Sequence, residues 1–274
     1  PSPIYLGSDS VLLDREGKVT LAGDSILTVT STCVLELYVP MVGSSATYLL
    51  QIENGATVVM HMETSLAGQA VMDMDALLQV DNNGSLTLTT TSITKMSGAN
   101  LIFSEEADFY MEGAASLNFT GSSVITLATD SVMLVSDSVS VWTDDLSHVL
   151  LNCGTVHVSG AGTDVLVSRI VSPCGLVEVD VNAQLSLDVE LWLQGSALVD
   201  PLAGEIIVGS SAQTSKLTLD DGAVIRGTGS LVAHDSFTFA GADLSALTFT
   251  YFTENSSGTI GSSSVSPILL PVYI

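Results

Sequence analysis

Two six-residue stretches of this chain repeat each other at a step of about 21 residues, and this repeat constrains the fold more than any other feature. Residues 153–158 are Cys-Gly-Thr-Val-His-Val, and residues 174–179 are Cys-Gly-Leu-Val-Glu-Val. One step further along, residues 195–199 are Gly-Ser-Ala-Leu-Val. A step of this size suits one coil of a β-solenoid, in which each turn of the chain stacks on the turn before it.

The rest of the chain shows the short alternation that is typical of β-strands. Residues 85–89 and 216–220 alternate polar and apolar side chains, and Gly, Asn, Asp and Ser separate such runs. No stretch combines a sustained helical period with a cap. A sandwich or barrel also has short strands, but it has no reason to repeat at this step. We therefore predict an all-β fold, a single-stranded parallel β-helix (β-solenoid) with a coil of about 21 residues.

The equivalent positions of Cys153 and Cys174 leave two interpretations open. Stacked strands lie about 4.8 Å apart, which is within the Cα separation of a disulfide. The pair therefore forms either an inter-coil disulfide or two stacked thiols that act as small apolar residues. The same step aligns Leu166 with Leu187, and we expect both to point into the core.

Composition limits the classes of partner. The chain has 274 residues, of which 46% are hydrophobic, so it can bury a large core. It carries 30 acidic and 6 basic residues, a net charge of -24. That balance argues against nucleic acid, anionic membrane surfaces and polyanionic substrates, because binding phosphate requires clustered Lys and Arg. No apolar run has the length of a membrane-spanning helix, so membrane insertion is not expected.

The succession of strand, Gly turn and strand from Val11 to Phe252 resembles the pectin-lyase-like right-handed parallel β-helix proteins, a group that includes adhesin passengers and phage tailspikes. The resemblance implies an enzyme of acidic polysaccharides that uses a carboxylate cluster, often calcium, and a basic residue. The related hydrolases share an Asp-Asp pair, a Gly-His-Gly and an Arg-Ile-Lys. This chain has the pairs Asp144-Asp145 and Asp220-Asp221 but neither of the other two motifs, so no catalytic residue is assigned.

Cofactor ligands are equally sparse. Residues 81–84 and 220–222 offer oxygen ligands at turns, which leaves calcium as the only cofactor to consider. Cys153 with His157 is a weak zinc pattern, and the Met-His-Met run at residues 60–62 is better explained by core packing than by copper binding. No cofactor and no metal ligand are therefore predicted.

The two ends of the chain differ from its centre. We predict an apolar N-terminal segment at residues 1–10, the solenoid at 11–252, and a Ser/Gly linker with an apolar C-terminal strand at 253–274. The first residue is Pro rather than Met, which suggests a processed form. The apolar strand either folds back on its own solenoid or adds to the edge of a second copy. The residues predicted to make the subunit contact are Ile268, Leu269, Leu270, Val272, Tyr273 and Ile274.

These patterns together favour an extracellular structural protein at a cell or virion surface. It is expected to associate with copies of itself, as a homo-oligomer or polymer, into a fibre, coat or surface layer without catalysis. Three sequons predict N-glycosylation at Asn83, Asn118 and Asn255. The alternative is a tailspike-like or lyase-like β-helix that binds or cleaves glycans, with a groove lined by Trp142, Trp192 or tyrosines beside carboxylates.

Overall fold

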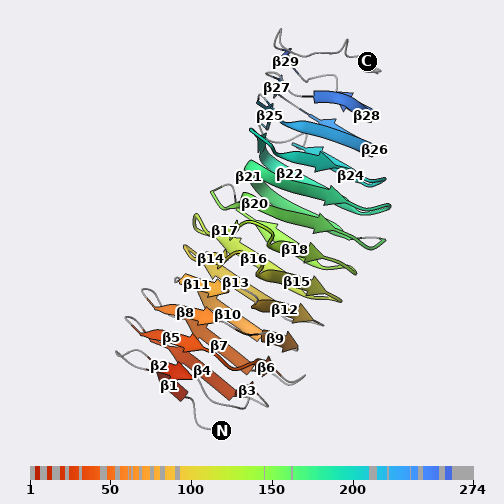
Figure 1. Ribbon diagram of the computed structural model, residues 1–274. Helices are drawn as coiled ribbons and strands as arrows, with labels where there is room; N and C mark the ends of the chain where they lie inside the picture. The colour runs from red at the N-terminus through yellow and green to blue at the C-terminus, as the bar shows by residue number, and fades with distance from the viewer. Residues whose placement is uncertain are drawn as a thin grey trace.

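The predicted parallel β-solenoid is confirmed. A computed structural model describes residues 4–6, 11–13, 19–21, 25–30, 33–43, 48–52, 56–60, 62, 64–67, 70–74, 77–80, 84–89, 93–144, 146–161, 163–209, 215–220, 222–234, 236–239, 243–252 and 257–260. These residues form 29 strands in one continuous parallel sheet, which stacks upward from the N-terminus as an elongated body (Figure 1). In this part of the chain no helix is long and apolar enough to cross a membrane.

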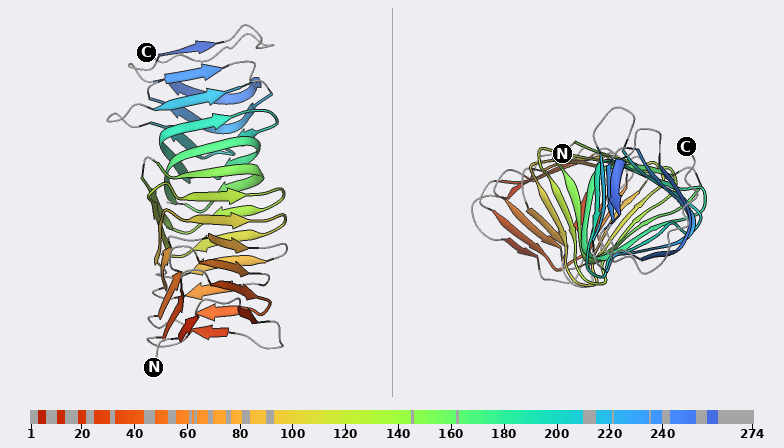
Figure 2. Two further views of the ribbon diagram at one scale, coloured as in Figure 1. Left: turned by 90° about the vertical axis from the view of Figure 1, so that its left-hand side faces the viewer. Right: turned by 90° about the horizontal axis from the view of Figure 1, so that it is seen from above.

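Each coil has three sides, which we call faces A, B and C in chain order. Figure 2 shows the strands of successive coils lying over one another along the body. Face A consists of β1 (Ile4–Leu6), β4 (Ser25–Val29), β7 (Tyr48–Ile52), β10 (Ala70–Met74), β13 (Ile93–Ser97), β16 (Ser116–Thr120), β19 (Ser140–Thr143), the first parts of β21 (Asp164–Val179) and β22 (Gln184–Leu193), β24 (Glu205–Val208), and the last parts of β26 (Val224–Ala233) and β28 (Asp243–Phe252).

Faces B and C are built in the same way. Face B consists of β2 (Val11–Leu13), β5 (Val34–Leu37), β8 (Thr57–Met60), β11 (Leu77–Val80), β14 (Asn100–Phe103), β17 (Val124–Leu127), the first part of β20 (His148–Val158), the middle of β21, the last part of β22, β25 (Lys216–Leu219), β27 (Ser236–Phe239) and β29 (Ser257–Ile260). Face C consists of β3 (Val19–Leu21), β6 (Met41–Gly43), β9 (Thr64–Ala67), β12 (Ser85–Thr89), β15 (Asp108–Glu112), β18 (Val132–Val135), the last parts of β20 and β21, β23 (Leu198–Asp200), and the first parts of β26 and β28.

The coil is longer than predicted. Successive coils are about 23 residues apart, and the step of 21 residues holds at the Cys-Gly repeat, where Thr155 pairs with Leu176. The expected alignment of Leu166 with Leu187 is wrong, because Leu187 pairs with Val167 and Leu166 pairs with Ser186. Leu166 therefore faces outward and is half-buried. The register shifts just after Val167, since the upper coil has one more residue at this corner.

An eight-residue unit explains the coil in the middle of the molecule. Each corner there ends in a buried small or β-branched side chain, and the next strand points two apolar residues inward. Three such units make one coil, which matches the pairing of Val124 with His148. The buried corner residues are Ala99, Ala107, Ala115, Ser123, Ser131, Val139 and Ser147.

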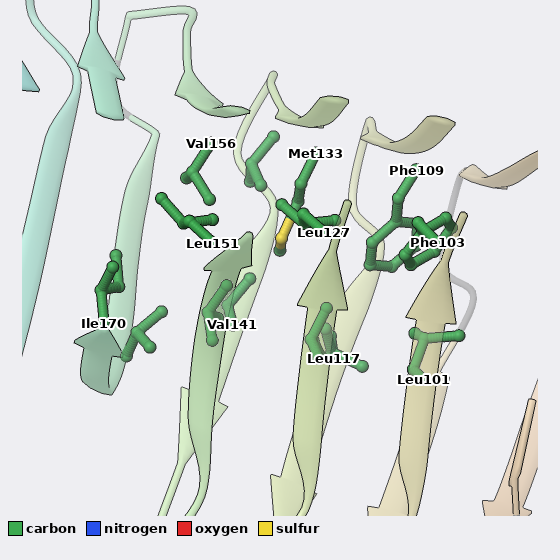
Figure 3. Close-up of a cluster of buried hydrophobic side chains, with 14 of the residues drawn as sticks. Leu101, Phe103, Phe109, Leu117, Leu127, Met133, Val141, Leu151, Val156 and Ile170 are labelled. Atoms are coloured by element: carbon green, nitrogen blue, oxygen red, sulfur yellow. The ribbon is translucent and has the colours of Figure 1, made fainter. Parts of the chain in front are cut away.

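The core is continuous along the body and is made of the inward residues of all three faces. Phe103 and Phe109 stack across the corner between faces B and C, with their ring centroids 5.1 Å apart. Figure 3 shows Leu127 beside Met133 in the same relation on another coil. Burying such side chains supplies the main stabilisation of the stack.

Both ends of the described stack have strands that pair on one side only. Within the described residues, β1, β2 and β3 pair only with strands of the next coil, and β28 and β29 pair only with strands of the preceding coil. The stacking thus extends from Ile4 to Ile260, past the predicted bounds of 11 and 252. The predicted contact strand from Ile268 to Ile274 lies outside the described residues.

Candidate functional sites on the outer faces

Stacking aligns outward side chains of successive coils into rows, and three rows carry polar or aromatic chemistry. Row C, on face C, contains His157, Glu178, Asp200 and Arg226. The Nε2 atom of His157 lies 3.2 Å from Oδ1 of Asp180. Arg226 Nε donates to Oδ2 of Asp200 at 3.0 Å. The Asp200–Arg226 contact joins two members of row C, whereas Asp180, the partner of His157, lies outside the row.

Asp200 is the most enclosed charge of row C, with 7% of its surface exposed. Its Oδ1 atom has no hydrogen-bond partner. The carboxylate lies against the backbone of Gly227, where an added Cβ would come within 2.6 Å of Oδ1. The glycine therefore makes room for the carboxylate, and Arg226 neutralises it.

Row B, on face B, contains His148, Arg169, Glu190 and Lys216 on successive coils. Glu190 lies between two cations, 3.9 Å from Arg169 Nε and 3.9 Å from Lys216 Nζ. Burial lowers the pKa of His148; the backbone hydrogen bond of Leu146 opposes this shift, and the charge of Arg169 adds to it. His148 is therefore neutral at pH 7. The ion pairs of row B join members of the same row.

Row A, on face A, contains Lys95, Asn118 and Trp142, which are register partners in turn. Lys95 is exposed, and Trp142 exposes 46% of its surface. Asn118 is half-buried, but its Oδ1 atom is buried and has no hydrogen-bond partner. Row A thus holds an exposed amine, an enclosed amide carbonyl and an aromatic plane within three coils.

The two tryptophans proposed for a glycan groove lie on different faces. Trp142 belongs to face A, and Trp192 belongs to face B, where its Nε1 donates to Oδ2 of Asp220 at 2.8 Å. Tyr110 lies on face C and donates to Asp108. This hydrogen bond, with burial and the carboxylate charge, raises the pKa of Tyr110 to about 12. The structure does not bring these three aromatic residues together.

The cysteines of the sequence repeat are joined. Cys153 and Cys174 form a disulfide at the corner between faces B and C, with their Cα atoms 4.5 Å apart. Because Cys153 is engaged in this bond, it is not available as a zinc ligand beside His157. Cys33 is buried and is not part of a disulfide.

The described member of each predicted acid pair, Asp144 or Asp220, lies at a corner. Asp144 accepts hydrogen bonds from the backbone N–H groups of Gly121, Leu146 and Ser147, so it closes its own corner and ties it to the coil below. Asp220 binds Trp192. Asp145, Asp221 and the turn at 81–83 lie outside the described residues. Among the described residues, no three His, Cys, Asp or Glu side chains gather where they could hold a metal ion.

Of the three predicted glycosylation sequons, the structure describes only the one at Asn118. Asn83 and Asn255 lie outside the described residues. Asn118 lies in the middle of β16 rather than on a loop, and Thr120 of the same sequon donates its hydroxyl to the carbonyl of Met96. The surface loop that suits a glycosylation acceptor is therefore absent at Asn118.

Comparison of the chain with models of protein families, with curated proteins and with solved structures found no match. Sequence reasoning missed all three rows, because a row can be aligned only when the length of each coil is known. Lys95 and Asn118 are 23 residues apart, whereas His157 and Glu178 are 21 apart. The buried Ala or Ser at the corners is the signal that could have supplied these lengths.

Proposed function

We propose that this protein is an extracellular structural protein whose solenoids join end to end into a fibre. The observation that carries the proposal is that the strands at both ends of the described stack pair on one side only. Within the described residues, such edges leave N–H and C=O groups unpaired, and these groups can pair with a second copy. Because the lower and upper edges are different surfaces, their contact is head-to-tail and generates an open filament.

Two further features support this proposal. Within the charged rows on faces B and C, ion pairs join residues of adjacent coils. The disulfide between Cys153 and Cys174 fits an oxidising, extracellular compartment. A solenoid that transmits load along its axis gains from both kinds of link, since each one joins successive coils.

The lower edge offers a specific test at Thr20. Val19 donates its N–H to the carbonyl of Pro40 in the next coil at 2.9 Å. In a parallel ladder, alternate residues direct their backbone groups to opposite neighbours, so the N–H of Thr20 faces the open side. Thr20→Pro removes this donor, and Thr20→Val retains it with the same shape.

The expected result is filaments in electron micrographs of the unmodified protein and of Thr20→Val, and a single monomer in sedimentation velocity of Thr20→Pro. Circular dichroism should show the same β content in all three proteins. If Thr20→Pro polymerises as well as Thr20→Val, edge pairing is not the mode of association. If the unmodified protein stays monomeric at high concentration and physiological salt, the structural function is wrong.

A second function, glycan binding, is favoured by the exposed indole of Trp142 on a flat face. An exposed indole beside an amide and an amine can stack on a sugar ring and bind its hydroxyls. Trp142→Ala should then remove binding in a glycan array, whereas Trp192→Ala, on face B, should retain it. A reducing-end assay on any glycan retained would separate binding from cleavage. Equal loss of binding in both variants would contradict a site at Trp142.

A further inference from the structure

Row A places an amine next to a carboxamide on adjacent coils. Lys95 of β13 is the register partner of Asn118 of β16, so their Cα atoms are separated by the strand spacing of about 4.8 Å. Both residues point to the outer side of face A, since the inward positions of these strands are taken by Met96 and Phe119. The lysine stem is long and flexible, and it can reach the neighbouring side chain.

The amide of Asn118 is partly enclosed on the outer side of face A. The Oδ1 atom of Asn118 is buried without a hydrogen-bond partner, although the residue as a whole is half-buried. Trp142 follows Asn118 on the next coil and flanks it. A carbonyl in such a place is shielded from water on its oxygen side, and leaving it unpartnered is costly.

We propose that Lys95 and Asn118 form an intramolecular isopeptide bond that joins two successive coils covalently. The Nζ atom of Lys95 attacks Cγ of Asn118, the new C–N bond forms, and the bond from Cγ to Nδ2 breaks. Nδ2 leaves as ammonia, which takes up the proton released from the lysine ammonium group, so the products are an amide and an ammonium ion. No oxidant, reductant or cofactor is consumed.

Asp73 completes the arrangement at the level of register. It is the partner of Lys95 on the coil below, which places a proton-accepting residue type next to the amine in the ladder. A carboxylate at this position can relay the proton from the lysine to the leaving nitrogen. The bond closes a loop of the same kind as the disulfide, but in the other half of the molecule and on another face, and it does not depend on the proposed filament.

The decisive experiment is intact-mass spectrometry of the full chain, followed by peptide mapping under reducing conditions. The expected mass is that of the sequence less two hydrogens for the disulfide and less one ammonia for the isopeptide. Tandem spectra should show one branched peptide that contains Lys95 and Asn118. Lys95→Arg and Asn118→Ala should each restore the ammonia mass, whereas the matched control Lys216→Arg should not. Asp73→Asn should slow the appearance of the branched peptide in freshly synthesised chain.

Cyclisation of the Asn-Gly sequences at residues 54–55 and 83–84 also removes ammonia, and the variants distinguish it. A loss of ammonia that persists in Lys95→Arg overturns the proposal. So does an unmodified Lys95 that reacts fully with an amine acetylating reagent in the folded protein, or a glycan found on Asn118. If Lys95→Arg fails to fold, the branched peptide in the unmodified chain still decides the question.

Discussion

Gly154 lies at the corner between faces B and C, where successive coils approach each other closely. A Cβ added to Gly154 would lie 2.6 Å from the Cβ of Leu127 and 2.8 Å from the carbonyl oxygen of Ala128. On the next coil, an added Cβ at Gly175 would lie 2.5 Å from the carbonyl oxygen of Gly154. The glycines of the Cys-Gly repeat are therefore required by the stacking itself.

Gly154→Ala is accordingly expected to lower the free energy of unfolding. The methyl group meets the backbone, which cannot move aside as a flexible side chain can, and such overpacking costs about 1–3 kcal/mol. Urea unfolding followed by circular dichroism measures the change. Asn152→Ala, at an exposed position two residues earlier, is the control and should stay within about 0.5 kcal/mol. Equal stability of Gly154→Ala and the control would show that the corner can widen.

Asp144 makes stability depend on acid pH. Partial burial acts to raise its pKa, but hydrogen bonds from Ser147, Gly121 and Leu146 outweigh this and hold the pKa below its ordinary value of 3.8. Because the folded pKa lies below the unfolded value, the contribution is fully present above pH 4 or so and is lost as the pH falls through the folded pKa. Asp144→Asn should cost about 1–2 kcal/mol at pH 7, since it removes charged acceptors.

The pH dependence of stability shows whether Asp144→Asn acts through the lost charge or through a change in the shape of the side chain. The difference between Asp144→Asn and the unmodified protein in urea unfolding should shrink as the pH is lowered from 5 towards about 2. Asp130→Asn, at another exposed corner, serves as the control. A difference that stays constant with pH would mean that the carboxylate charge at Asp144 does not contribute.

At the scale of the element, the corner decides how much of the fold can be predicted. The alternation of the strands and the stacked cysteines were sufficient to predict a parallel solenoid. Glycine spacing failed to give the coil length, because corner residues with positive φ include Glu106, Asp130 and Asn182 as well as glycines. These residue types tolerate that conformation, so the glycine is optional at the corner. A buried small or β-branched residue, in contrast, recurs at every corner from Ala99 to Ser147.

The outer rows could not be predicted from the sequence for a related reason. A side chain on one coil meets a partner whose number depends on every corner between them, and corners vary in length. Row A steps from Lys95 to Asn118 to Trp142 by 23 and then 24 residues. An error of one residue exchanges the inner and outer sides of a strand, as happened with Leu166 and Leu187.

The disulfide is a link between elements, since it ties β20 to β21 across a loop of 21 residues. Removing it with the double substitution Cys153→Ser and Cys174→Ser should lower the free energy of unfolding by about 3 kcal/mol, because the unfolded chain regains the entropy of the open loop. Thermal unfolding with and without a reductant measures this. The reductant should have no effect on the double variant; if it does, a second redox-sensitive group contributes.

At the scale of the whole molecule, the net charge of -24 opposes contact between copies. If the solenoids join through backbone edges, salt should strengthen the association, since it screens this repulsion without weakening the hydrogen bonds at the contact. The screening length falls from about 30 Å at 0.01 M salt to about 8 Å at 0.15 M. Sedimentation velocity across this range should show longer species as sodium chloride is added, with Thr20→Pro remaining monomeric throughout.

Calcium and magnesium chloride at matched ionic strength provide the control for a bound cation. Equal effects of the two salts indicate screening, and an effect of calcium alone would mean that calcium bridges the copies. Association that weakens with added salt would show that ion pairs, not strand edges, hold the copies together.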